Sequence, residues 1–214
     1  MSPFPLILSA PSGGGKTTIA RALLARRPDL GYSVSCTTRE PRRGEVNGRD
    51  YWFLSREEFL ARRARDEFAE CAEVHGQLYG TLRSEVDRVL ESGRHVVMDI
   101  DVQGALQFTA AFPGAVTVFV LPPSADVLLR RLRERRTENP DELIARLRSA
   151  VDELRAVEEY KYVVLNDEVE RAVGRVSAII DAEMVTCERT VGLREAVERL
   201  SSQLEQEIVT VGAK

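Results

Sequence analysis

Residues 10–17 read APSGGGKT, a glycine-rich run that closes with a lysine and a threonine. Consecutive backbone N–H groups of such a run can converge on phosphate oxygens, and a helix that begins at its end adds the positive end of its dipole. Lys16 would then contact the β- and γ-phosphates of a nucleoside triphosphate, with the Thr17 hydroxyl on magnesium. The run follows an apolar strand pattern and opens a helical one, which favours a phosphate loop over a chance glycine-rich turn.

The first position of this loop departs from the usual pattern. The pattern G-x-x-x-x-G-K-[ST] opens with glycine, and Ala10 stands there in this chain. Alanine is tolerated if its φ is negative, and a positive φ would cost about 1 kcal/mol, too little to abolish a site. We therefore expect a triphosphate to be bound by Ala10, Pro11, Ser12, Gly13, Gly14, Gly15, Lys16 and Thr17.

Short apolar runs rich in β-branched residues alternate with helical patterns along most of the chain. The strand patterns cover 6–9, 95–101, 116–121 and 162–166, and the helical patterns cover 17–27, 83–91, 125–135 and 141–158, the last with Asn139 as its N-cap. Each strand is expected to be buried on both faces. The alternation predicts an α/β fold, in which a parallel sheet is covered by helices on both sides.

Residues 33–81 interrupt this alternation. They hold short strand-like pieces, one helical segment at 56–65 and the turn-rich run PRRGEVNGRD. We predict a small mixed-sheet insertion between the first and second core strands, and a second insertion in the arginine-dense run 130–148. The residues after 181 carry a partial apolar stripe at helical spacing, which would pack on the protein's own core or form a seam with a partner.

Composition limits the classes of function. Lys and Arg number 30 against 34 acids, and the net charge of −4 argues against general affinity for nucleic acid or anionic membranes. The three cysteines are widely spaced and there are two histidines, which favours reduced thiols in the cytoplasm over a zinc site. No signal peptide or membrane-spanning stretch is apparent. Phosphate binding must therefore be local.

Four separated motifs agree in identity and spacing with the guanylate kinases. They are the loop, SVSCTTREPRRGEVNGRDYWFLS, FAECAEVHGQLYGT and VVMDIDVQGA, and the resemblance runs from 4 to 183. Many bacterial members are similar in beginning the loop with alanine. The resemblance implies a P-loop kinase core (3–32, 82–129, 149–183), a GMP-binding insertion (33–81), a helical lid (130–148) and, beyond the domain, a helical tail (184–214). It also implies transfer of the γ-phosphate of ATP to GMP.

The resemblance assigns the GMP phosphate to Arg39, Arg42, Tyr51 and Tyr79. Guanidinium groups suit this role because they bind a dianion bidentately and stay charged. Two arginines three residues apart would by themselves indicate only an exposed turn.

Guanine selection is assigned by the resemblance to Ser35, Glu70 and Thr81. The pairing edge of guanine shows an acceptor and two adjacent donors, so a carboxylate can accept both donors while hydroxyls reach O6. Adenine would place the lone pair of its N1 against that carboxylate, and such rejection can reach about 10⁴. Taken alone, Glu70 would be an ordinary solvated strand glutamate.

Two aspartates follow the strand pattern of 95–101. Asp99 and Asp101 are two apart in an extended chain, so they should point the same way. The resemblance implies Asp101 on the guanine nucleotide and Asp99 on magnesium through water. Capping of the next helix is the alternative. Adenine is expected near Asn166 and Asp167, for which a polar turn that closes a strand is the alternative.

Phosphoryl transfer to GMP needs no general base, because a GMP phosphate oxygen is already a nucleophile. It needs cations to offset the charge, and the resemblance supplies Lys16, Arg39 and the lid arginines Arg131, Arg135 and Arg146. The register of the lid arginines stays open because the run is so rich in arginine. Closure of the insertion and the lid on the core is expected to exclude water.

The expected substrates are ATP and GMP, with dGMP as a further acceptor and Mg²⁺ as cofactor. The oligomeric state is left open. A non-catalytic guanylate kinase-like interaction module is the alternative, and the retained Lys16 and lid arginines argue against it. Glu70 argues against a kinase for another nucleoside monophosphate.

Overall fold

The computed structural model describes residues 2–74, 76–134 and 140–212 of the chain. It divides into two compact units, one of Pro3–Ala178 and one that comprises Met1–Ser2 and Ile179–Lys214. All of the predicted site residues lie in the first unit or in the run 135–139. Among the described residues, no helix is long and apolar enough to cross a membrane.

A five-stranded parallel sheet forms the centre of the larger unit. Its order is β2 (Leu30–Tyr32), β7 (His95–Met98), β1 (Pro5–Ser9), β8 (Val116–Leu121) and β9 (Tyr162–Leu165). The predicted parallel α/β fold is confirmed. The sequence pattern misses β2, because an edge strand of three residues that contains a glycine gives no apolar run.

The expected burial of every strand on both faces is wrong for β9. β1 and β7 are buried throughout, whereas Val163 and Leu165 of β9 are 51% and 37% exposed. β9 pairs only with β8 and lies at the edge of the sheet, where a strand has a neighbour on one side alone. The strand expected at 95–101 also ends earlier, at Met98.

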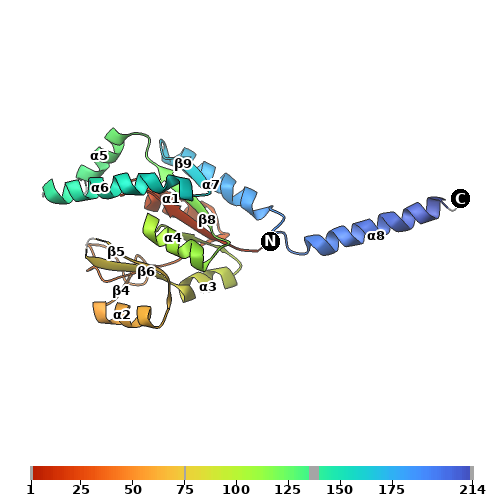
Figure 1. Cartoon of the computed structure of the whole chain (residues 1–214), viewed down its shortest axis with the longest axis horizontal. Coiled ribbons are helices and arrows are strands. Elements are labelled where there is room, and N and C mark those ends of the chain that lie inside the picture. The colour runs from red at the N-terminus through yellow and green to blue at the C-terminus, as the bar shows by residue number, and fades with distance from the viewer. Residues whose placement is uncertain (1, 75, 135–139, 213–214) are drawn as a thin grey trace. The chain divides into compact units, whose positions relative to one another are not determined.

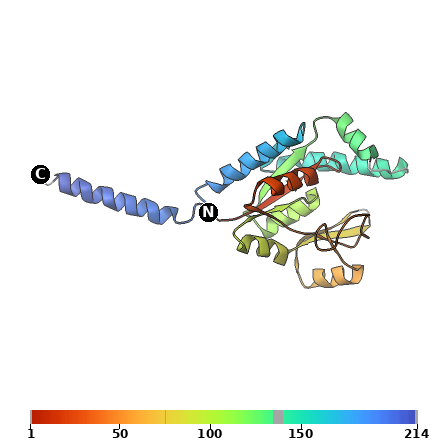
Figure 2. The same ribbon diagram turned by 180° about the vertical axis from the view of Figure 1, so that it is seen from behind.

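Helices cover the sheet on both faces (Figures 1 and 2). On one face, α3 (Arg83–Glu91) and α4 (Val102–Ala111) share an apolar core with alternate strand residues such as Ile7, Val96 and Met98. On the other, α1 (Lys16–Arg26) follows the glycine-rich run and contacts β1 and β2. The period-2 alternation of a strand thus places every second residue against each helix layer.

The insertion forms its own small sheet, as predicted. The strands β3 (Cys36–Thr37), β4 (Trp52–Phe53), β5 (Phe68–Val74) and β6 (Gln77–Leu82) stand in the order β4-β3-β6-β5, with parallel and antiparallel pairs. α2 (Arg56–Ala64) packs on it, and the rings of Phe59 and Phe68 stack with centroids 4.3 Å apart. The insertion lies between β2 and β7, one core strand later than expected.

The remaining helices follow β8 and β9. α5 (Ala125–Glu134) and α6 (Pro140–Arg155) pack together through Leu128, Leu132 and Ala150 and correspond to the expected lid, while a 3₁₀ turn (Ala156–Glu159) leads into β9. α7 (Val169–Met184) is a helix that the sequence patterns did not indicate. α8 (Leu193–Gly212) is the expected helix of the C-terminal tail. The expected N-cap Asn139 lies outside the described residues.

Candidate functional site

The loop predicted to bind phosphate joins the end of β1 at Ser9 to the first residue of α1, Lys16. The N–H of Gly14 donates to the carbonyl of Pro11 at 2.7 Å, which closes a tight turn. Gly15 has φ +97, in the left-handed region that favours glycine. Ala10 is not among the described non-glycine residues with positive φ, so alanine fits this position without backbone strain, as expected.

Ala10 also explains why the loop needs glycine at position 14. Ala10 is 1% exposed, and a Cβ added to Gly14 would lie 2.6 Å from its Cβ. A Cβ added to Gly15 would meet Asn166 Nδ2 at 2.4 Å. The backbone of the loop is therefore packed against the methyl group of Ala10 at Gly14 and against the side-chain amide of Asn166, which follows β9, at Gly15.

Three side chains from distant segments hold the loop's backbone. Asn166 Nδ2 donates to the carbonyl of Gly14 at 2.7 Å, and Arg131 Nη1 lies 3.4 Å from the same oxygen. Glu153 Oε2 on α6 accepts from the N–H of Ser12 at 3.0 Å. Burial raises the pKa of Glu153, and the hydrogen bond from Ser12 and the charge of Lys16 oppose this shift. Sequence reasoning missed Glu153, for which no motif gives a signal.

The two residues expected near adenine have different roles in the structure. Asn166 is 2% exposed and bonds to the loop itself. Asp167 accepts from the N–H of Glu168 at 2.8 Å and pairs with Arg171 of α7. The structure thus shows Asp167 in the polar-turn role that was the alternative at this position.

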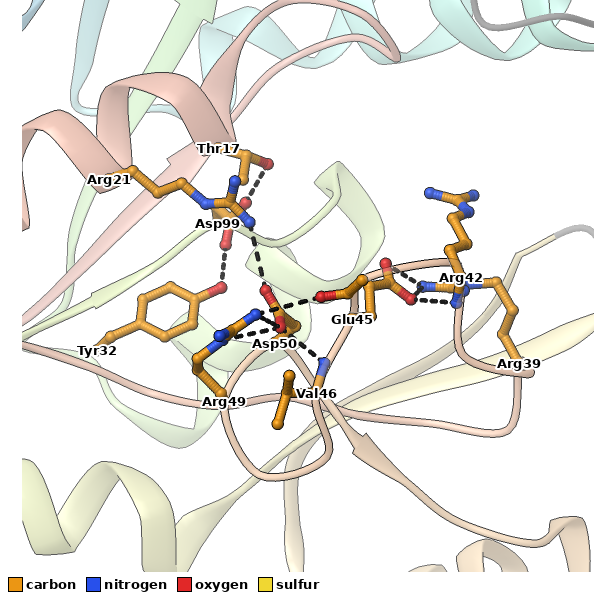
Figure 3. A network of polar contacts seen from close by, with 11 residues as sticks. Thr17, Arg21, Tyr32, Arg39, Arg42, Glu45, Val46, Arg49, Asp50 and Asp99 are labelled. Atoms are coloured by element: carbon orange, nitrogen blue, oxygen red, sulfur yellow. Dashed lines mark hydrogen bonds and ion pairs between the residues drawn. The ribbon is translucent and has the colours of Figure 1, made fainter.

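Two hydroxyl groups donate to the carboxylate of Asp99, one to each oxygen (Figure 3). Thr17 Oγ1 donates to Asp99 Oδ2 at 2.5 Å, and the hydroxyl of Tyr32 donates to Oδ1 at 2.6 Å. Burial, with the charge of Asp99, raises the pKa of Tyr32, so this hydroxyl stays a donor at neutral pH. Sequence reasoning placed Thr17 and Asp99 together correctly and missed Tyr32, which lies in the strand that it also missed.

Asp101 lies elsewhere and caps α4. Its carboxylate accepts from the N–H of Gly104 at 2.7 Å. Because β7 ends at Met98, Asp99 and Asp101 both follow the strand, and they bond to different partners. The capping role, left as an alternative, is what the structure shows for Asp101.

Glu70 and Thr81 are buried and meet across β5 and β6. Thr81 Oγ1 donates to Glu70 Oε1 at 2.6 Å, and Ser35 Oγ lies 3.4 Å from Thr81 Oγ1. Glu70 is 6% exposed, so the solvated-glutamate alternative is wrong. Burial raises the pKa of Glu70 to about 7, against the hydrogen bond from Thr81 that lowers it. The structure thus brings together the three residues predicted to select guanine.

The first turn of α4 lies against the carboxylate of Glu70. A Cβ on Gly104 would lie 2.6 Å from Glu70 Oε2 and 3.4 Å from Asp101 Oδ1. Gly104 is therefore required for the carboxylate of Glu70 to approach the helix, and Asp101 lies near enough to raise the pKa of Glu70. Glu70 and Asp101, both expected at the guanine nucleotide, thus lie close together at the N-terminus of α4.

The carboxylate of Glu45 binds to both of the arginines that were predicted to hold the GMP phosphate, through the guanidinium of Arg39 and the backbone N–H of Arg42 (Figure 3). Arg39 Nη2 donates to both carboxylate oxygens of Glu45 at 2.9 Å, and Glu45 Oε2 accepts from the N–H of Arg42 at 2.7 Å. The guanidinium of Arg39 lies 5.5 Å from the Tyr51 ring centroid, which in turn lies 6.1 Å from that of Tyr79. Sequence reasoning missed Glu45, although it lies in the same turn-rich motif as both arginines.

The turn that carries these arginines also contacts α1. Asp50 accepts from the N–H of Val46 at 2.9 Å, and its Oδ1 lies 3.5 Å from Arg21 Nη2 of α1 (Figure 3). Of the lid arginines, Arg131 reaches the loop, Arg146 is half-buried on α6, and Arg135 lies outside the described residues. The described part of the site thus spans the loop, the insertion and both lid helices.

Comparison with known proteins agrees with this arrangement. The family model described as guanylate kinase matches residues 2–183. The guanylate kinase of Caldanaerobacter subterraneus is 47% identical over 86% of this chain and 89% of its own. That of Paramagnetospirillum magneticum is 47% identical over 91% and 92%. The crystal structure of guanylate kinase from Anaplasma phagocytophilum is similar with a TM-score of 0.77, 37% identity, and coverage of 92% and 95%.

The family match covers the whole of the larger unit, and the two relatives align over nearly the full length of both chains. The glycine-rich loop, the buried pair of Glu70 and Thr81 and the arginine-bearing turn all fall within the matched residues. The chain therefore belongs to the guanylate kinase family, enzymes that phosphorylate GMP with ATP.

Proposed function

We propose that the loop 10–17 holds the triphosphate of ATP, and that the insertion 33–81 presents the phosphate of GMP to its terminal group. One observation carries this proposal. The segment 99–104 contacts Thr17 of the loop at one end, through Asp99, and Glu70 of the base pocket at the other, through Gly104. Six residues span at most about 20 Å, so the two nucleotide sites are close enough for their phosphates to meet.

The chemistry follows from positioning. A GMP phosphate oxygen attacks the γ-phosphorus of ATP while the bond to the β-γ bridging oxygen breaks, and ADP leaves. Lys16, Arg39 and Arg131 supply positive charge at the bridging and equatorial oxygens, with Arg135 and Arg146 proposed as further lid contributors. Arg42, Tyr51 and Tyr79 complete the grip on the GMP phosphate. Adenine is proposed to lie near Asn166 and Asp167.

Magnesium fits the pair Thr17 and Asp99. Both supply oxygen atoms, which Mg²⁺ prefers, and the two already approach each other at 2.5 Å. Mg²⁺, when bound, offsets phosphate charge and orients the triphosphate. No group of three or more His, Cys, Asp or Glu within the described residues could hold a metal, so the remaining ligands would be water and phosphate.

Glu70 provides the proposed selectivity for guanine. Its carboxylate would accept from guanine N1–H and the exocyclic amine, while Ser35 and Thr81 reach O6 and Asp101 contacts the guanine nucleotide. None of these assigned contacts reads the 2′-hydroxyl, so dGMP is expected to be an acceptor as well. The insertion 33–81 and the lid 130–148 are proposed to close on the core during transfer, which would exclude water.

A coupled ADP-release assay with GMP, dGMP, AMP, UMP and CMP tests the proposal. We expect turnover with GMP and dGMP, and rates with the other acceptors lower by about 10³-fold or more. Lys16→Ala should lower kcat by about 10²- to 10³-fold, because it removes a charge aimed at the transferred group. Lys161→Ala, which changes the lysine immediately before β9 and outside the loop, is the control. Comparable rates with AMP, or an undiminished Lys16→Ala rate, would overturn the proposal.

A further inference from the structure

α8 presents a continuous apolar face that is open to solvent. Six apolar residues recur every three or four positions, which places them on one face of the helix. They are Leu193, Val197, Leu200, Leu204, Ile208 and Val211. Leu193 is half-buried, and the exposed fraction of the other five runs from 52% at Val197 to 70% at Ile208. A contiguous exposed apolar face of this kind marks an interaction surface rather than ordinary surface.

The charges of α8 are divided between its two halves. Residues 193–199 carry two arginines and two glutamates, whereas 200–212 carry two glutamates and neither Lys nor Arg. A second copy that packs in parallel would bring the two acidic halves together. A second copy that packs antiparallel brings each acidic half against the half that holds the arginines, and it also opposes the two helix dipoles.

The positions of these charges match an antiparallel pair. Arg194 and Glu205 lie on the same side of the apolar face, because eleven residues make almost three full turns. The face is nearly symmetric about Leu200, with Val197 three residues before it and Leu204 four after it. An antiparallel pair centred between Arg199 and Leu200 therefore places Arg194 of one copy opposite Glu205 of the second copy.

We propose that α8 is a self-association element, through which two copies of this chain form a dimer by antiparallel packing of their apolar faces. Burial of the faces supplies the affinity, and the charges at their edges set the direction. A helix of 20 residues is about 30 Å long, so the contact is short and the dimer depends on protein concentration.

Sedimentation velocity on the full chain over a roughly 100-fold range of concentration tests this proposal. We expect the mass to rise from 23.9 kDa towards twice that value. Leu204→Glu should keep the chain monomeric throughout, because it places a charge in the apolar face. Gln206→Glu adds the same charge on the opposite side of α8 and should dimerise like wild type. Kinase activity of both variants checks that the larger unit is folded.

A charge-reversal pair tests the direction. Arg194→Glu should weaken dimerisation about tenfold, because it places a glutamate opposite Glu205 of the second copy. The double variant Arg194→Glu, Glu205→Arg should restore the wild-type dissociation constant. A double variant that stays as weak as the single one overturns the antiparallel arrangement.

Two other outcomes overturn the dimer itself. One is a wild-type chain with a mass of 23.9 kDa at every concentration, which would mean that the face is covered by its own chain or by lipid. Flotation with phosphatidylglycerol vesicles would identify lipid as the occupant. The other is equal disruption by Gln206→Glu and Leu204→Glu, which would show that the apolar face is not the contact.

Discussion

The two ends of the proposed GMP site are built in opposite ways. At the base end, Glu70 and Thr81 are buried and hydrogen-bonded to each other before any ligand arrives. At the phosphate end, Arg39 and Arg42 lie on a turn, and Glu45 occupies the guanidinium of Arg39. The base end is thus a fixed template, whereas the phosphate end is an ion pair that a dianion can exchange.

The two ends also differ in their effect on stability. Burial raises the pKa of Glu70 to about 7 from a usual 4.5, so the folded state holds a proton that the unfolded state releases between these values. The stability contribution of Glu70 therefore falls as pH rises through this window. The half-buried pair of Arg39 and Glu45 contributes little. The residue proposed to select guanine, Glu70, is thus one whose buried ionised form lowers the stability of the fold.

The largest effect is expected at the base end. Glu70→Gln replaces one acceptor oxygen by an amide NH₂ group, so a donor faces the donors of guanine. We expect the dissociation constant of GMP to rise about 10³-fold while that of ATP stays unchanged, measured by separate binding titrations. Glu73→Gln, on the same strand but with an exposed side chain, is the matched control. Equal weakening of ATP and GMP would show that Glu70 acts on the fold and not on the base.

The phosphate end should respond less, because several groups share the dianion. Arg39→Lys keeps the charge and loses the bidentate fork, and we expect the KM for GMP to rise about 50-fold. Arg43→Lys, an exposed arginine of the same turn, should leave the KM unchanged. If Arg39→Lys changed GMP affinity as much as Glu70→Gln, the phosphate end would be as rigid a template as the base end.

The pH dependence of GMP binding distinguishes the two ends within one protein. Glu70 must be ionised to accept from guanine, and burial raises its pKa to about 7, so GMP should bind more tightly as pH rises from 6 to 8. The affinity for GMP should rise about tenfold over this range, because the ionised fraction of Glu70 falls about tenfold for each pH unit below its pKa. In Glu70→Gln only the titration of the GMP phosphate, near pH 6, should remain. A wild-type profile as flat as that of Glu70→Gln would remove the role of the carboxylate.

The sequence predicted one end of the site better than the other, for a physical reason. Glu70, Thr81 and Ser35 were grouped by the resemblance to guanylate kinases, and the register of β5 and β6, which pairs Glu70 with Thr81, explains why two of them meet. Ala10 was judged acceptable because a single dihedral decides the matter, and the structure agrees. Local rules suffice where a contact is set by strand pairing or by one backbone angle.

The contacts that sequence reasoning missed depend on distance in the chain or on competing local roles. Glu153 reaches the loop from 141 residues away, and no local pattern encodes such a contact. Tyr32 lies on an edge strand too short to give a periodic signal. Asp101 could bind a ligand or cap a helix, and the spacing to Asp99 could not decide between these roles until β7 was seen to end at Met98.

Tyr32 extends the comparison to the triphosphate side, where the smallest effect is expected. Tyr32→Phe removes the hydroxyl that donates to Asp99 Oδ1 at 2.6 Å and, among the residues that the structure describes, leaves the carboxylate its contact with Thr17. We expect the Mg²⁺ concentration for half-maximal rate to rise about fivefold, with an unchanged KM for GMP, because groups behind a ligand orient it.

Tyr160→Phe is the matched control for Tyr32→Phe, because Tyr160 is a buried tyrosine and its hydroxyl is not one of the two described groups that donate to Asp99. Its Mg²⁺ dependence should equal that of wild type. A Tyr32→Phe enzyme with the same Mg²⁺ dependence but a raised KM for GMP would place Tyr32 at the acceptor side. The hydrogen bond from Tyr32 to Asp99 would then not orient a magnesium ligand, and the triphosphate side would resemble the exchangeable phosphate end rather than the fixed base end.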